Sequence, residues 1–218
     1  MSDATPDTLI RIAEHYYPRG FPPEADDPRL PKQAFERTPE YVRWLGLWGQ
    51  APVLERWRAL KSRWRAEFPH LELLDFTRPR AASCYLSLVY FRAPLPDGAT
   101  RVTRLVGAVS LLAPLYLVYF TAQTVWPGRR FSPPEIDFSQ PEHGSAEPGG
   151  GEGTSTGSTH LRPYALWLAR LFEQEWGARP FPLALANFPL PHLRIFHLNQ
   201  EPPTLLNAFF LEQPEHLP

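Results

Sequence analysis

The chain has 218 residues with 22 basic and 23 acidic side chains, and its formal charge of −1 does not favour nucleic acid or an anionic membrane as a partner. Hydrophobic residues make up 43% of the sequence, which is enough for a packed core in a single domain over residues 1–218. Cys84 is the only cysteine, so an intramolecular disulfide and a thiolate metal cluster are both excluded.

Three N-terminal segments have apolar residues at the spacing of one helical face. The first begins at Thr5-Pro6, where a capping side chain precedes a first-turn proline, and the second repeats this signal at Thr38-Pro39. The third covers residues 52–67. Its apolar stripe contains Val53, Trp57, Leu60 and Trp64, and its basic residues are Arg56, Arg58, Lys61, Arg63 and Arg65.

From residue 70 the apolar period changes to two, which predicts strands at 71–73 and 84–91 and a turn at 94–98. Residues 105–128 form the longest uncharged run, which is long enough to cross a bilayer. Pro114 interrupts the run, polar residues dilute it, and most of its other residues are strand formers. We therefore predict two adjacent strands at 102–112 and 115–126 in preference to a membrane span.

The remainder of the chain alternates loops with short elements. Residues 132–160 contain a Gly-rich acidic stretch without lysine or arginine, which predicts a flexible loop. A helix follows, with Pro163 in its first turn and Gly177 at its end. A strand is expected at 193–198 and a short apolar helix at 203–210. These elements predict an α+β domain with a central, mainly antiparallel sheet and helices on one face.

The sequence contains no recognisable catalytic or cofactor-binding motif. The seven histidines include no HExxH pair, a G-x-S-x-G elbow is absent, and neither phosphate-binding glycine pattern follows a strand. Cys84 opens an apolar strand without a basic neighbour, which predicts a core thiol. We therefore assign no catalytic residue, cofactor or metal site and expect a protein that is not an enzyme, although an enzyme without a recognisable motif stays an alternative.

Nucleic acid is an unfavoured partner for the arginine-rich third helix. Its arginines could contact phosphates, and its tryptophans could stack on bases. However, Trp57 and Trp64 share the apolar stripe of the helix and are therefore expected to be buried. The arginines alone predict a solvated face.

Charge is distributed unevenly along the chain, which suits a protein that binds another protein. The formal charge is −3 over residues 1–40, +8 over 41–130 and −6 over 131–218. Complementary charge accelerates encounter between proteins and rejects wrong partners. The acidic C-terminal third could meet a basic partner, or the arginine-rich middle could meet an acidic one.

Four segments together resemble uncharacterised bacterial proteins that are encoded beside secreted polymorphic toxins. They are residues 109–119, residues 130–135, the helix through Trp167 and Phe172, and residues 204–210. The resemblance covers the second half of the chain and implies an immunity protein, which binds its cognate protein toxin and occludes the active site. It identifies no functional residue, and the Gly-rich insertion at 144–157 departs from the compact loop expected of the group.

The predicted protein is therefore a cytoplasmic monomer or homodimer that neutralises a toxin by stoichiometric binding. The absence of a basic and apolar N-terminal signal favours this location. A structural subunit of a larger assembly is the other alternative, and the acidic loop could equally be a passive linker. Exposed loop carboxylates beside a rigid sheet can enter a cationic cleft. The predicted partner-binding residues are Glu135, Asp137, Glu142, Glu147 and Glu152.

Overall fold

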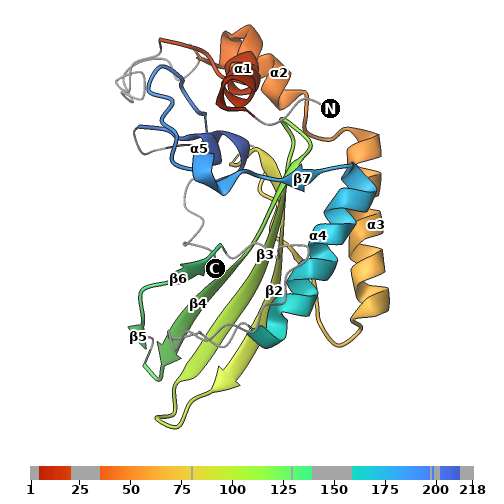
Figure 1. Ribbon diagram of the computed structural model, residues 1–218, viewed down its shortest axis with the longest axis vertical. Coiled ribbons are helices and arrows are strands. Elements are labelled where there is room, and N and C mark those ends of the chain that lie inside the picture. The colour runs from red at the N-terminus through yellow and green to blue at the C-terminus, as the bar shows by residue number, and fades with distance from the viewer. Residues whose placement is uncertain are drawn as a thin grey trace.

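The computed structural model describes residues 5–20, 35–79, 81–128, 130–138, 159–196, 198 and 202–211. A long twisted sheet forms its centre, and helices lie against it and at one end (Figure 1). The helices are α1 (Pro6–Tyr16), α2 (Pro39–Leu45), α3 (Ala51–Glu67), α4 (Arg162–Trp176) and α5 (Leu205–Phe209), with short 3-10 turns at Phe35–Arg37, Thr159–Leu161 and Leu183–Leu185. The strands are β1 (Leu74–Asp75), β2 (Cys84–Pro94), β3 (Thr100–Ser110), β4 (Leu115–Trp126), β5 (Arg130–Phe131), β6 (Glu135–Asp137) and β7 (Arg179–Pro180).

The sheet is mixed but mostly antiparallel, which confirms the predicted α+β class. Strands β1 to β4 follow one another in space, and β5, β6 and β7 each pair with β4. Only β7 runs parallel to its neighbour among these strands. The uncharged run forms β3, β4 and the turn between them, as predicted. No helix among the described residues combines the length and apolar composition needed to cross a membrane.

The helix boundaries follow the signals in the sequence. The Thr5 hydroxyl accepts a hydrogen bond from the backbone N–H of Thr8 at 3.3 Å, and Thr38 accepts one from Tyr41 at 3.2 Å. Gly177 ends α4 with φ of 58°, in the left-handed region that favours glycine. The predicted starts of α1 and α2 and the predicted end of α4 are therefore confirmed.

Helices cover both faces of the sheet, so the prediction of helices on one face is wrong. Trp57 and Trp64 of α3 pack with Phe172 of α4 in the hydrophobic cluster on one face. Leu9 of α1, Trp44 of α2 and Phe209 of α5 belong to the cluster on the other face. Residues 84–89 of β2 are all buried. A strand that lies between two layers of helices is apolar on both sides, so this burial agrees with helices on both faces.

Three other predictions needed correction. In the segment 193–198, the described residues 193–196 and 198 form no strand. Leu193 makes a single bridge with Arg19, and the N–H of Arg194 donates to the carbonyl of Pro18. The strand expected at 71–73 begins later, at Leu74. Within the expected loop at 132–160, β6 forms at the edge of β4 and a 3-10 turn forms at Thr159–Leu161, while residues 139–158 lie outside the described part of the chain.

Candidate functional site

Three concave regions surround residues 69–75, the segment that returns from the end of α3 to the edge of β2. A groove of about 630 Å³ separates this segment from α3. A cavity of about 600 Å³, here called the sheet cavity, lies on the face of the sheet where α4 begins. A third hollow, of about 970 Å³, is lined by Tyr90, Arg92 and Arg104. Leu71 contributes to all three, so the segment is the common wall of this concave surface.

The 69–75 segment is anchored from both ends. The indole N–H of Trp64 donates to the backbone carbonyl of Leu71 at 3.0 Å, and the N–H of Leu71 donates to the carbonyl of Phe68 at 3.0 Å. At the other end, Leu74 and Asp75 form β1 and pair with Leu88 and Ser87 of β2. The segment therefore has a defined position between α3 and the sheet.

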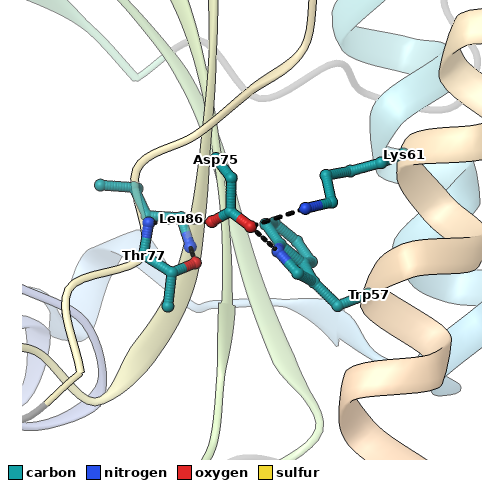
Figure 2. Close-up of polar contacts among 5 residues, drawn as sticks. All are labelled: Trp57, Lys61, Asp75, Thr77 and Leu86. Carbon is teal, nitrogen blue, oxygen red and sulfur yellow. Dashed lines mark hydrogen bonds and ion pairs between the residues drawn. The ribbon is translucent and has the colours of Figure 1, made fainter.

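Asp75 joins α3 to the sheet through three hydrogen bonds (Figure 2). Its Oδ2 accepts from the Nε1 of Trp57 at 2.8 Å and from the Nζ of Lys61 at 2.7 Å, and its Oδ1 accepts from the backbone N–H of Thr77 at 3.1 Å. The Thr77 hydroxyl in turn accepts from the backbone N–H of Leu86 in β2 at 3.1 Å. The carboxylate thus fixes the floor of the groove beside the basic face of α3.

The environment of Asp75 favours its ionised form. Burial by itself raises the pKa of this carboxyl, but the hydrogen bonds from Lys61, Thr77 and Trp57 together outweigh burial and hold the pKa below 3.8. A carboxyl whose pKa is lower in the folded than in the unfolded state stabilises the fold above its unfolded pKa. That contribution is lost as the pH falls through the folded pKa.

Asp75→Asn should therefore lower the free energy of unfolding at pH 7, and the difference from the wild type should shrink as the pH falls below about 4. Urea unfolding of both proteins between pH 7 and pH 3 measures this difference. Glu72→Gln is the matched control, because Glu72 is exposed on the same segment and has no ion-pair partner among the described residues. A difference for Asp75→Asn that stays constant with pH would contradict the assignment.

Tyr85 completes the buried wall behind Asp75. Its ring lies between the rings of Trp48 and Trp57, with centroid distances of 5.7 and 5.2 Å. Its hydroxyl is buried and has no hydrogen-bond partner among the residues that the structure describes. Burial, and then the negative charge of Asp75, raise the pKa of Tyr85, so the phenol stays protonated. Tyr85 and the two tryptophans therefore pack the start of α3 against β2.

The groove between α3 and the 69–75 segment is basic. Arg58, Lys61 and Arg65 lie on one face of α3 at spacings of three and four residues, and His70 faces them from the segment. Lys61 is paired with Asp75. Neither Arg58 nor Arg65 has an ion-pair partner among the described residues, and both are exposed. Glu72 also lines the groove and is unpaired among the described residues, so Arg58 and Arg65 face one free carboxylate and the groove keeps a net positive charge.

The other two basic residues of α3, Arg56 and Arg63, differ in their pairing. Arg63 pairs with Glu175 of α4 at 2.6 Å, whereas Arg56 is exposed and has no such partner in the described part of the chain.

Trp57 and Trp64 are only 2% and 0% exposed, which confirms their predicted burial. Neither ring is available to stack on a nucleic acid base, and both instead hold α3 against the sheet.

Two of the predicted partner-binding residues line the sheet cavity. Glu135 and Asp137 lie on β6, and Arg101 of β3 holds Glu135 through two bonds, of 3.1 and 2.5 Å. The bonds from Arg101 lower the pKa of the Glu135 carboxyl, which is half exposed. Glu135 is therefore already paired with a cation. The other predicted residues, Glu142, Glu147 and Glu152, lie outside the described residues, and a binding role for all five stays a prediction.

Sequence reasoning missed Asp75, Arg92 and Arg101 as parts of this concave surface. The alternation of residues along β2 and β3 could have placed Arg101 on a face, but the register that brings it beside β6 is a tertiary property. The predicted core thiol, Cys84, is fully buried, and burial raises its pKa to about 12. Among the described residues, no group of three His, Cys, Asp or Glu side chains could hold a metal ion.

No family model, curated protein or solved structure matches this chain.

Proposed function

We propose that this chain is an immunity protein that neutralises a protein toxin by stoichiometric binding, and that its basic groove receives an acidic surface of that toxin. The observation that carries this proposal is the unpaired positive charge of Arg58 and Arg65 in a groove with a rigid floor. The resemblance of the second half of the chain to proteins encoded beside polymorphic toxins supports the class of partner.

The position of α3 suits it to protein binding. Trp57, Leu60 and Trp64 are buried on one side of the helix. They hold its backbone in place, so the basic side chains on the other side are attached to a fixed backbone. A preorganised surface loses little conformational entropy when it binds. Acidic groups on a partner would be attracted by the groove and would find cations without partners. Binding across the groove would occlude the acidic surface of the toxin.

The pairing of Glu135 supports placing the proposed interface on the basic middle of the chain. Glu135 is held by Arg101, and a partner would have to displace this pair to use its carboxylate. Arg58 and Arg65 require no such displacement.

The test is binding to the toxin encoded by the adjacent gene, measured by calorimetry at two salt concentrations. Wild-type protein should form a one-to-one complex whose affinity falls as the salt concentration rises. The double variant Arg58→Glu/Arg65→Glu should bind about 100-fold more weakly and should lose most of that salt dependence. It should also fail to protect cells that express the toxin.

The control is Arg11→Glu/Arg170→Glu, which makes the same charge change on exposed faces of α1 and α4. This variant should bind like the wild type. Failure of the wild type to bind would overturn the proposed function. Equal weakening by both double variants would instead overturn the assignment of the groove as the interface.

A further inference from the structure

Strand β2 has a free edge beyond β1. On one side, β3 pairs with β2 along its whole length, from Cys84 to Pro94. On the other side, β1 pairs only with Leu88 and Ser87, and no strand among the described residues pairs with positions 91–94. These four residues, on the side away from β3, are here called the free edge. They lie where β2 and β3 extend beyond the helices (Figure 1).

The backbone of Arg92 points out of the free edge. Leu86 gives the direction, because its carbonyl accepts from the N–H of Phe76 at 2.8 Å and its N–H donates to the Thr77 hydroxyl at 3.1 Å. The backbone groups of a strand alternate between its two sides, and the register with β3 is unbroken. The N–H and C=O of Arg92 and the C=O of Pro94 therefore point away from β3. Neither residue has a hydrogen-bond partner on that side among the described residues.

The position of Pro94 agrees with this direction. Proline has no N–H, so a strand tolerates it where that N–H would point away from the neighbouring strand. Pro94 lies opposite Thr100 in the ladder between β2 and β3, two positions beyond Arg92. Its nitrogen therefore lies on the free edge, where no bond to β3 is lost. The free edge offers one N–H and two carbonyls to an extended chain.

A second copy of this chain is a poor occupant of the free edge. Antiparallel pairing of two copies around Arg92 would place the two arginines directly opposite each other, where like charges are destabilising. Charged residues commonly protect edge strands against such self-pairing. Arg92 is exposed and has no ion-pair partner in the described part of the chain. An acidic side chain opposite Arg92 would instead form a favourable cross-strand pair.

The free edge is continuous with the basic groove. The third hollow lies between the free edge and the 69–75 segment, since Arg92 and His70 both line it. His70 and Glu72 also line the groove on the other side of the segment. Glu72 and Arg104 line the hollow together with Arg92, so its charge is mixed. The backbone groups, and not the net charge, therefore identify an extended chain as the occupant.

We infer that the free edge of β2 receives an extended segment of the partner as an added strand, with an acidic residue opposite Arg92. This inference rests on the proposed function for the identity of the partner. Strand addition gains affinity from main-chain hydrogen bonds and specificity from the alternate side chains of the added strand. A partner in the basic groove reaches the free edge across the 69–75 segment, which lines both.

The direction of the free edge can be tested without the partner. Arg92→Pro removes an N–H that points outward, so its melting temperature should stay near that of the wild type. Ala93→Pro is the matched contrast. Ala93 is also exposed, but its N–H faces β3 opposite Arg101, so this variant should melt well below the wild type. Equal melting of the two variants would overturn the inference.

Hydrogen exchange of the free wild-type protein, detected by NMR, provides a second check on the free edge. The Arg92 amide should exchange at least about tenfold faster than the Ala93 amide, because only the Ala93 amide is bonded within the ladder. Binding of the toxin partner should slow exchange at Arg92. An Arg92 amide that is as protected as that of Ala93 in the free protein would contradict the inference.

Calorimetry with the toxin partner tests the occupant. Arg92→Gln keeps the backbone N–H and should weaken binding by only about threefold, through the lost charge. Arg92→Pro should bind about tenfold more weakly than Arg92→Gln, because it also leaves a carbonyl of the added strand without its donor. If these two variants bind equally while Arg58→Glu/Arg65→Glu binds poorly, the proposed function stands and this inference is wrong. If the wild type binds no toxin, the proposed function fails, and the inference about its partner fails with it.

Discussion

Gly107→Ala should lower the free energy of unfolding by about 2 kcal/mol. Gly107 lies in β3 directly beneath α4, and a Cβ atom there would lie 2.5 Å from the Cδ2 of Leu168 and 3.0 Å from the Oγ of Ser87. Leu168 and Ser87 are fully buried, so neither can move without disturbing its neighbours. Urea unfolding of the purified protein measures the loss.

Gly46→Ala is the matched control for this substitution. A Cβ at Gly46 would have its nearest contacts at 3.4 Å, and the residue has φ of −66°, which any amino acid adopts. Replacement of a glycine in such a conformation restricts the unfolded chain, so we expect no loss and up to about 1 kcal/mol of added stability. A loss at Gly46 as large as the loss at Gly107 would show that steric overlap with α4 is not the cause.

Tyr17→Phe should cost about 2 kcal/mol, because it removes the centre of a buried polar network. The Tyr17 hydroxyl donates to the carbonyl of Ala208 at 2.7 Å and lies 2.5 Å from the Oγ of Ser83. Ser83 also accepts a hydrogen bond from the Nε1 of Trp44 at 2.9 Å. The network joins α1, α2 and α5 to the residue that precedes β2, so its loss weakens one whole end of the domain.

The pH dependence and a neighbouring tyrosine provide checks on this result. Burial raises the pKa of Tyr17 well above its ordinary value, so the network should persist from neutral pH to pH 10. Tyr16→Phe removes the same hydroxyl from a half-buried tyrosine that has no hydrogen-bond partner among the described residues, and should change stability by less than about 0.5 kcal/mol. Equal effects of the two substitutions would contradict a special role for the Tyr17 network.

Local signals in the sequence predicted most of the elements of this fold. Thr5, Thr38 and Gly177 mark helix ends through interactions with their own backbone, which a sequence displays directly. The strand formers on either side of Pro114 likewise predicted β3 and β4. The strand predicted at 193–198 was wrong because Leu193, Ile195 and Leu198 are apolar for burial in the core, while the backbone makes only single contacts with residues 18–20.

The site was less accessible to sequence reasoning, because it depends on which segments meet. The basic face of α3 was visible as a pattern, but the groove exists only because residues 69–75 return along the helix and Asp75 binds Trp57 and Lys61. The pairing of Arg101 with Glu135 depends on contacts between β3, β4 and β6. Residues more than thirty positions apart in the sequence form no local pattern that predicts such a contact.

Hydrogen exchange of the chain alone and in complex with the proposed toxin partner tests the central claim most directly. If that partner occupies the basic groove, the backbone amides of residues 70–73 should exchange markedly more slowly in the complex than in the free protein. Slower exchange confined to the end of the domain that contains α1, α2 and α5, with residues 70–73 unchanged, would contradict the groove as the binding surface.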